Sequence, residues 1–175
     1  MSGGPFNVLF LCTGNSARSI LAESILRKDG AGRFNAFSAG SRPKGAVNPM
    51  ALSVLREFGY PTEDLRSKPW EEFATPDAPV MDFVFTVCDQ AAGEACPVWP
   101  GQPMTAHWGI EDPSHENRGE IWSRAAFTTA FRYLKNRISA FAALPIESLE
   151  RSRLSVKVRE IGQLDGASFR PSDVA

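Results

Sequence analysis

Residues 8–19 read Val8-Leu9-Phe10-Leu11-Cys12-Thr13-Gly14-Asn15-Ser16-Ala17-Arg18-Ser19, an apolar run, a short polar loop and the start of a helical pattern. The run predicts a buried strand over residues 7–11, and the pattern after the loop predicts a helix from Ser19 to Lys28. The first N–H groups of a helix have no partner inside it, and the helix dipole favours negative charge there. This strand, loop and helix therefore predict an oxyanion site.

Two side chains of the loop carry the chemistry. Arg18 follows Cys12 by six residues, and its planar, permanently charged guanidinium suits a tetrahedral oxyanion. The same field stabilises a thiolate, which is the form that attacks, so we expect the pKa of Cys12 to lie below its ordinary value of about 8.5. The loop thus combines an oxyanion binder with a nucleophile.

The composition is that of an ordinary globular chain. It has 175 residues, 43% apolar and 22% charged, with a net charge of −1, so we expect one domain over residues 1–175, with a core over about 6–144 and a helical tail over 145–175. The charge gives no reason to expect nucleic acid or an anionic membrane surface as a partner. The sequence shows neither an apolar run of about 20 residues, as a membrane span needs, nor a signal peptide, which predicts a cytoplasmic protein.

Strand and helix patterns alternate along the chain. Further strands are predicted over residues 34–39, 83–87 and 105–110, and helices over 48–59, 120–144 and 146–161, with a loop over 89–104. This order predicts an α/β fold, a doubly wound open sheet of about four parallel strands flanked by helices. Ligands of such sheets bind at the carboxyl ends of the strands, so Cys12, Cys88 and Asp112, each just after a predicted strand, should meet at one edge.

The chain has three cysteines, Cys12, Cys88 and Cys96. Without an export signal they do not predict a structural disulfide framework. One interpretation is a nucleophile with partners for thiol–disulfide exchange, and the other is that Cys88 and Cys96 are ordinary core or loop thiols. The two histidines lack metal-ligand spacing, so no zinc site is predicted.

Residues 8–19, together with Asp112-Pro113, resemble the low-molecular-weight protein tyrosine phosphatase superfamily, and specifically its arsenate reductase branch, from about residue 7 to about residue 144. The resemblance implies that Cys12 is the nucleophile and Asp112 the general acid. It also implies that the substrate is bound by the loop, namely Thr13, Gly14, Asn15, Ser16, Ala17, Arg18 and Ser19.

Two features favour the reductase branch. In the phosphatases tyrosines usually follow the acid, whereas Ser114-His115 stands here, and Tyr60 and Tyr133 fall in predicted helical regions away from the mouth of the site. The segment 86–100, with Cys88 and Cys96, resembles the reductases, whose additional cysteines carry the redox chemistry.

The resemblance implies thiol-dependent reduction of arsenate to arsenite, as used in arsenic detoxification. Cys12 would attack arsenate, Cys88 would attack the Cys12 sulfur, and Cys96 could then attack Cys88 and leave a disulfide for thioredoxin. Thioredoxin-coupled members have one residue fewer between these two cysteines, so glutathione with glutaredoxin could replace part of the relay. In some reductases the positions that match Asn15, Glu23 and Ser38 help to hold potassium, whereas no tightly bound cofactor is implied.

Three other functions fit parts of the pattern. A phosphatase that hydrolyses phosphate monoesters through a Cys12 phosphoenzyme would need Arg18 and Asp112 but neither Cys88 nor Cys96. A redox sensor would form a Cys12–Cys88 disulfide without multiple turnover. An adaptor would bind a partner through residues 145–175, and its intact Cys12, Arg18 and Asp112 would remain unexplained.

Overall fold

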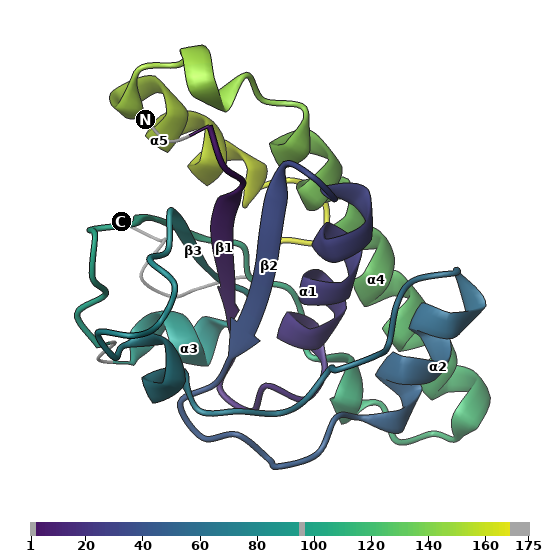
Figure 1. Ribbon diagram of the computed structural model, residues 1–175. Helices are drawn as coiled ribbons and strands as arrows, with labels where there is room; N and C mark the ends of the chain where they lie inside the picture. The colour runs from purple at the N-terminus through teal and green to yellow at the C-terminus, as the bar shows by residue number, and fades with distance from the viewer. Residues whose placement is uncertain (1–2, 95–96, 169–175) are drawn as a thin grey trace.

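A computed structural model describes residues 3–94 and 97–168 and contains a four-stranded parallel sheet (Figure 1). The strands are β1 (Phe6–Leu11), β2 (Phe34–Ala39), β3 (Phe83–Thr86) and β4 (Met104–His107), in the spatial order β2-β1-β3-β4. Every neighbouring pair is parallel. The predicted α/β fold is therefore confirmed.

Within the residues that the structure describes, five α-helices connect and cover the strands. They are α1 (Arg18–Asp29), α2 (Pro49–Glu57), α3 (Asp89–Gly93), α4 (Glu120–Ala142) and α5 (Arg151–Ile161). Short 3-10 turns lie in the connecting segments, namely η1 (Trp70–Phe73), η2 (Pro113–His115) and η3 (Ile146–Ser148). Asn48 caps α2 as its spacing before Pro49 predicts, since its side chain accepts a hydrogen bond of 2.8 Å from the Met50 N–H.

Three details of the prediction are wrong. The last helix, predicted over residues 146–161, begins only at Arg151, after the separate turn η3. The fourth strand ends at His107 rather than at residue 110, because its neighbour β3 ends at Thr86 and the chain then turns into α3. Residues 89–93, predicted as loop, form that short helix. Its start is stabilised by Cys88, whose sulfur accepts a hydrogen bond from the Ala91 N–H, a cap that thiols seldom provide and that sequence patterns do not indicate.

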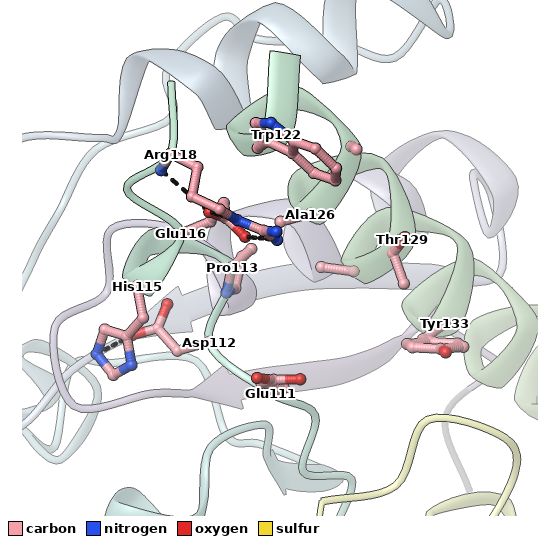
Figure 2. A pocket seen from close by; sticks show the side chains of 12 residues that line it. Glu111, Asp112, Pro113, His115, Glu116, Arg118, Trp122, Ala126, Thr129 and Tyr133 are labelled. Carbon is pink, nitrogen blue, oxygen red and sulfur yellow. Dashed lines mark hydrogen bonds and ion pairs between the residues drawn. The ribbon is translucent and has the colours of Figure 1, made fainter. Parts of the chain in front are cut away.

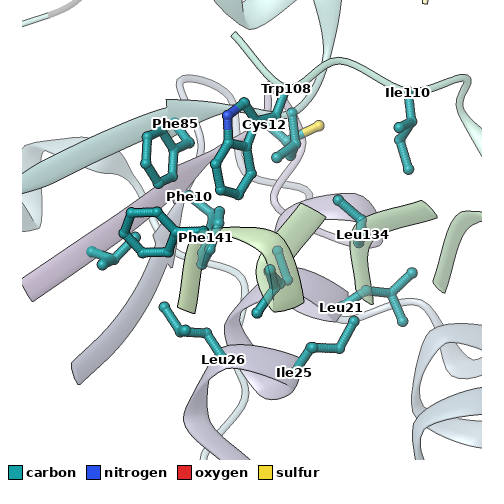
Figure 3. Packing of buried hydrophobic residues seen from close by; sticks show 14 of the residues in the cluster. Phe10, Cys12, Leu21, Ile25, Leu26, Phe85, Trp108, Ile110, Leu134 and Phe141 are labelled. Carbon is teal, nitrogen blue, oxygen red and sulfur yellow. The ribbon is translucent and has the colours of Figure 1, made fainter. Parts of the chain in front are cut away.

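Apolar side chains fill both faces of the sheet. On one face, Figure 3 shows Phe10, Phe85 and Phe141 packed with Trp108 and with residues of α1, and Cys12 belongs to the same cluster. The Phe85 and Trp108 rings are stacked with centroids 4.0 Å apart. On the other face η1 and the segment around Trp99 cover Leu9, Leu11 and Val84. The end of β1 that delivers Cys12 is thus held by close packing from both sides.

The carboxyl ends of the strands lie along one edge, as the parallel topology requires. Cys12 follows β1, Cys88 follows β3, and Asp112 comes five residues after the end of β4. In the described part of the chain, none of the helices has the length and apolar character that crossing a bilayer would require.

Candidate active site

Residues 12–17 form a loop between β1 and α1, and Asn15 is its centre. Asn15 is fully buried and has a φ of 43°, a left-handed conformation that asparagine tolerates better than most residues. Its amide donates to Ser19 Oγ at 2.8 Å and to Ser38 Oγ at 3.0 Å, and its Oδ1 accepts from the Lys68 N–H at 2.9 Å. These three bonds fix the curvature of the loop.

Arg18 is the first residue of α1 and reaches across to the segment after β4. Its Nη1 donates to the Ile110 carbonyl at 2.9 Å, and its Nη2 lies 3.4 Å from Asp112 Oδ2. The sequence places Arg18 and Asp112 far apart, and the sheet edge brings their side chains into contact.

Asp112 caps η2 and is held as a carboxylate. Its Oδ1 accepts hydrogen bonds from the Ser114 N–H and hydroxyl, and His115 Nε2 lies 3.3 Å from its Oδ2. Burial raises the pKa of Asp112, but Ser114 and Arg18 outweigh burial, so the pKa lies below its usual range. Displacement of Arg18 from Asp112 would therefore raise this pKa toward its usual range.

Cys12 and Cys88 are both buried and line the same cavity. The Cys88 sulfur accepts hydrogen bonds from the Thr13 N–H at 3.4 Å and the Ala91 N–H at 3.3 Å. The neighbouring Cys12 thiol, together with Arg18 and these amides, lowers the pKa of Cys88 to about 5 despite its burial. The neighbouring Cys88 and burial raise the pKa of Cys12.

The sequence predicts a lowered pKa for Cys12, whereas the donors in the structure converge on the neighbouring Cys88 and lower its pKa instead. The anion site stabilises one thiolate, as the sequence predicts, but the negative charge lies on Cys88 because more donors converge there. A thiolate on one sulfur then opposes ionisation of the other.

Titration of the thiols tests this charge distribution. In a Cys96→Ser background, thiolate absorbance near 240 nm is expected to appear with a midpoint close to pH 5. The additional replacement Cys88→Ser should remove that step and leave only the titration of Cys12, at higher pH. Because the folded pKa of Cys88 is depressed, its contribution to stability is complete above the unfolded value and is lost as the pH falls through about 5. A first midpoint near 8.5, the ordinary value, would contradict the assignment.

A cavity of about 230 Å³ opens in front of the thiols and is lined by the loop, Cys88 and Asp112. Its rim includes Arg42 and Lys44, which the sequence analysis did not assign to the site. Arg42 N–H and Lys44 N–H donate to the carbonyls of Thr13 and Gly14 and so pair their turn with the loop. The rule that ligands bind at the carboxyl ends of strands could have found them, because their turn follows β2.

A second, larger groove lies on the other side of Asp112, between η2 and α4. It has a volume of about 440 Å³, and Figure 2 shows Tyr133 and Trp122 projecting from α4 into it, with Arg118 from the preceding loop. Arg118 lies over the Trp122 ring, 4.1 Å from its centroid. Tyr133 does not line the oxyanion cavity, but α4 runs past η2 and brings it to this second groove, which Asp112 also lines.

The cluster predicted as a potassium site contains an internal cation. The Lys68 ammonium lies 3.3 Å from Ser38 Oγ and 3.5 Å from Glu23 Oε1, and Ser38 also donates to Glu23. Both charged side chains are almost fully buried. Burial lowers the pKa of Lys68, an effect that Glu23 opposes. These residues do not fit potassium, because an ammonium group already neutralises the oxygens that would coordinate the ion.

Loss of Lys68 is expected to be strongly destabilising. Lys68→Met leaves Glu23 buried without its ammonium, and removing one partner of a buried ion pair costs about 3–5 kcal/mol. Arg27 lies 2.7 Å from the other Glu23 oxygen and still compensates part of its charge. The free energy of unfolding, measured in urea, should therefore fall by an amount near the lower end of this range.

Arg66→Met is the matched control, because the Arg66–Glu72 pair is largely exposed and such pairs contribute about 0–1 kcal/mol. Glu23→Gln combined with Lys68→Met should recover much of the loss. Equal effects of the Lys68 and Arg66 variants would show that Lys68 has no special role as an internal cation.

Of the residues predicted for the site, the structure brings together around one cavity Cys12, Cys88, Asp112 and residues 13–18. Ser19 does not line the cavity, because it is fully buried behind the loop, where its Oγ accepts a hydrogen bond from the Asn15 amide. Cys96 lies outside the described residues. Glu94, two residues earlier in the chain, contacts the loop through a hydrogen bond of 2.8 Å from Thr13 Oγ1.

Comparison with known proteins agrees with this geometry. The low molecular weight phosphotyrosine protein phosphatase family matches residues 7–155, and the chain belongs to this family. An arsenate reductase of Bacillus licheniformis is 35% identical over 136 residues, which are 77% of this chain and 94% of the relative.

Solved structures of both activities share the fold. A structure described as an arsenate reductase in the phosphate binding state superposes with a TM-score of 0.65 at 29% identity, covering 79% of this chain and 97% of that one. A low molecular weight protein tyrosine phosphatase from T. tengcongensis gives a TM-score of 0.62 at 24% identity, covering 82% and 99%. The fold therefore does not distinguish reductase from phosphatase, and the side chains of the site must.

Proposed function

We propose that this protein reduces arsenate to arsenite at the expense of thiols. One observation carries the proposal: a second thiol, Cys88, lines the same oxyanion cavity as the nucleophile Cys12, close enough for each thiol to shift the pKa of the other. Hydrolysis of a phosphate ester needs one thiol, whereas reduction of arsenic(V) needs two electrons from two thiols. The relatives named arsenate reductase support the same conclusion.

The first step is attack by Cys12. Arsenate occupies the cavity, where the loop N–H groups and Arg18 bind its oxygens and Arg42 and Lys44 at the rim attract the anion. A proton passes from Cys12 to the neighbouring Cys88, so that the charge moves to the attacking sulfur. The Cys12 S–As bond forms, and an oxygen leaves as water.

Asp112 assists the departure of this oxygen. In the protein without substrate its carboxylate faces Arg18 at 3.4 Å. Bound arsenate takes over the guanidinium, which removes one cause of the lowered pKa of Asp112 and allows the carboxyl group to carry the proton for the leaving oxygen.

The second step transfers the electrons. Cys88, after loss of its proton to the solvent, attacks the Cys12 sulfur; the S–S bond forms and the S–As bond breaks with its electron pair remaining on arsenic. Arsenic(V) becomes arsenic(III), and the two thiols become a disulfide. Overall, arsenate and two thiols give arsenite, a disulfide and water.

An external thiol reductant then restores the enzyme. Cys96 attacks Cys88 and presents a Cys88–Cys96 disulfide to thioredoxin, or glutathione with glutaredoxin reduces Cys88 directly. The one-residue difference in cysteine spacing is the reason to test both donors.

The decisive experiment measures arsenite formed from arsenate by the purified protein, with thioredoxin and its reductase in one arm and glutathione with glutaredoxin in the other. Turnover in the first arm supports the Cys96 relay, and turnover in the second arm alone makes Cys96 dispensable. If neither arm forms arsenite but the protein hydrolyses p-nitrophenyl phosphate, the proposal is overturned in favour of a phosphatase.

A further inference from the structure

Residues 162–168 form a strap that follows α5 and lies beyond the part of the chain that the family matches, residues 7–155. In Figure 1 the strap is the yellow segment that runs beside α4. Its contacts lead from the interior of α4 to the residue next to Cys88.

The strap is anchored by a buried cation, Arg137 of α4, which has no exposed surface. Its guanidinium donates to the carbonyls of Leu164 at 3.0 Å and Asp165 at 3.1 Å, and more weakly to that of Gly162 at 3.5 Å. A guanidinium is a rigid fork of donors, so three carbonyls converging on it define one conformation of the turn. The start of the strap is therefore held in one conformation.

Beyond this anchor the strap crosses the sheet edge in close contact. Gly166 has a φ of 91°, and a Cβ there would lie 2.4 Å from the Tyr133 ring, so only glycine allows this approach. Ala167 forms an antiparallel bridge with Ile110, and the Ser168 N–H donates to the Gly109 carbonyl at 3.0 Å. The strap thereby pairs with the backbone between β4 and Asp112.

The strap ends on Asp89, the first residue of α3. Ser168 Oγ donates to Asp89 Oδ1 at 2.7 Å, and His107 Nε2 lies 2.7 Å from the same oxygen. His107 is held in turn by Thr86 Oγ1, 2.7 Å from its Nδ1. A Cβ on Gly109 would lie within 2.6 Å of all three side chains at this junction, so its absence makes room for them.

Asp89 determines where Cys88 lies. Cys88 directly precedes Asp89 and caps α3, and its sulfur accepts hydrogen bonds from Ala91 in α3 and from Thr13 in the oxyanion loop. A shift of the first turn of α3 would carry the Cys88 sulfur away from Cys12. A helix of five residues has little stability of its own and depends on such external contacts.

We propose that the strap holds Cys88 in position to attack Cys12, with Ser168 and Asp89 acting as positioning residues. This inference rests on the proposed function and adds to it a role for residues outside the family match. To form the disulfide, the Cys88 sulfur must approach the Cys12 sulfur along the line of the S–As bond that breaks. Displacement of Cys88 therefore slows the second step. The first step uses Cys12, Arg18 and Asp112, and it needs Cys88 only as the acceptor of the Cys12 proton, which the solvent can accept instead, so this step does not require Cys88 to be held in line.

The test compares Ser168→Ala, which removes the hydroxyl but keeps the backbone bond to Gly109, with Ser168→Thr, which keeps both. Reduced protein is mixed with arsenate for a single turnover and quenched with N-ethylmaleimide, and the Cys12–Cys88 disulfide is quantified by mass spectrometry. A second arm replaces arsenate by diamide, which oxidises the two thiols and is itself reduced to a hydrazine. A third arm measures p-nitrophenyl phosphate hydrolysis, in which Cys12 attacks phosphorus and water then hydrolyses the S–P bond, without attack by Cys88.

Ser168→Ala is expected to slow disulfide formation about tenfold in the first two arms, as loss of a hydrogen bond to a charged group predicts. Hydrolysis should stay within about twofold of the original rate, and Ser168→Thr should restore disulfide formation. Gly166→Val, which forces the strap away from Tyr133, should give the same pattern, with folding checked by circular dichroism.

Two results would overturn the proposal: disulfide formation unaffected by Ser168→Ala, or equal losses in all three arms, which would give the strap a role in folding alone. If the original protein forms the disulfide with diamide but not with arsenate, the proposed function fails. In that case the diamide arm alone tests whether the strap positions Cys88.

Discussion

Cys12→Ser is expected to abolish both arsenate reduction and aryl phosphate hydrolysis, with losses of at least about 10³-fold, because a serine hydroxyl at neutral pH is a far weaker nucleophile than a thiolate. The site offers no compensation. Cys88 lies beside the position, but Arg18 and the Thr13 and Ala91 amides still lower its pKa, which makes its thiolate too weak a base to activate a hydroxyl. Initial rates of arsenite formation and of p-nitrophenolate release measure the two losses.

The fold of this variant should survive. Serine is close to cysteine in volume, and the position lies where the buried cluster meets the cavity, so a hydroxyl can hydrogen-bond to Cys88. Calorimetric titration with arsenate should show that the anion still binds, because the loop amides and Arg18 remain. Arsenite formation within about tenfold of the original rate would refute the role of Cys12 as nucleophile.

Cys88→Ser is expected to separate the two activities. Arsenate reduction should fall by at least about 10³-fold, since no thiol is then positioned to attack the Cys12 sulfur. Hydrolysis of an aryl phosphate should persist, because it needs only Cys12, Arg18 and Asp112. Removal of Cys88 also removes the main cause of the raised pKa of Cys12, so hydrolysis should extend to lower pH.

Cys96→Ser is the matched control for this variant. It keeps Cys88 and should release one equivalent of arsenite in a single turnover, even where it fails to turn over with thioredoxin. Equal loss of both activities in Cys88→Ser would mean that the substitution damages the loop through Thr13. Undiminished arsenate reduction with glutathione would mean that an external thiol attacks Cys12 directly, and Cys88 would lose its assigned role.

The sequence was most informative where function depends on local chain geometry. Residues 8–19 predict the strand, the oxyanion loop and the helix, because an apolar run, a polar turn and a helix N-terminus constrain one another over a few residues. Placing Cys88 and Asp112 at the same site needed only the rule that parallel strands end at one edge. That rule also covers Arg42 and Lys44, which went unassigned.

The errors concern side chains that meet across the fold. Which sulfur of the Cys12–Cys88 pair carries the charge depends on the donors Thr13 and Ala91, and α3, which supplies one of them, has no helical pattern of its own. Lys68 enters the cluster around Glu23 through a loop whose path sequence periodicity does not describe. Tyr133 reaches the groove beside Asp112 because of how α4 packs against η2.

The sequence by itself determined the parallel α/β sheet, the oxyanion loop with its nucleophile, and the meeting of Cys12, Cys88 and Asp112 at one edge. These features depend on hydrophobic periodicity, turn residues and strand direction, all of which can be recognised in contiguous residues. Only the tertiary structure decided where the negative charge lies, that Lys68 occupies the predicted potassium site, and that residues 162–168 reach Asp89. Each of these depends on distances between groups remote in the chain, and charges and hydrogen bonds act over those distances rather than along the sequence.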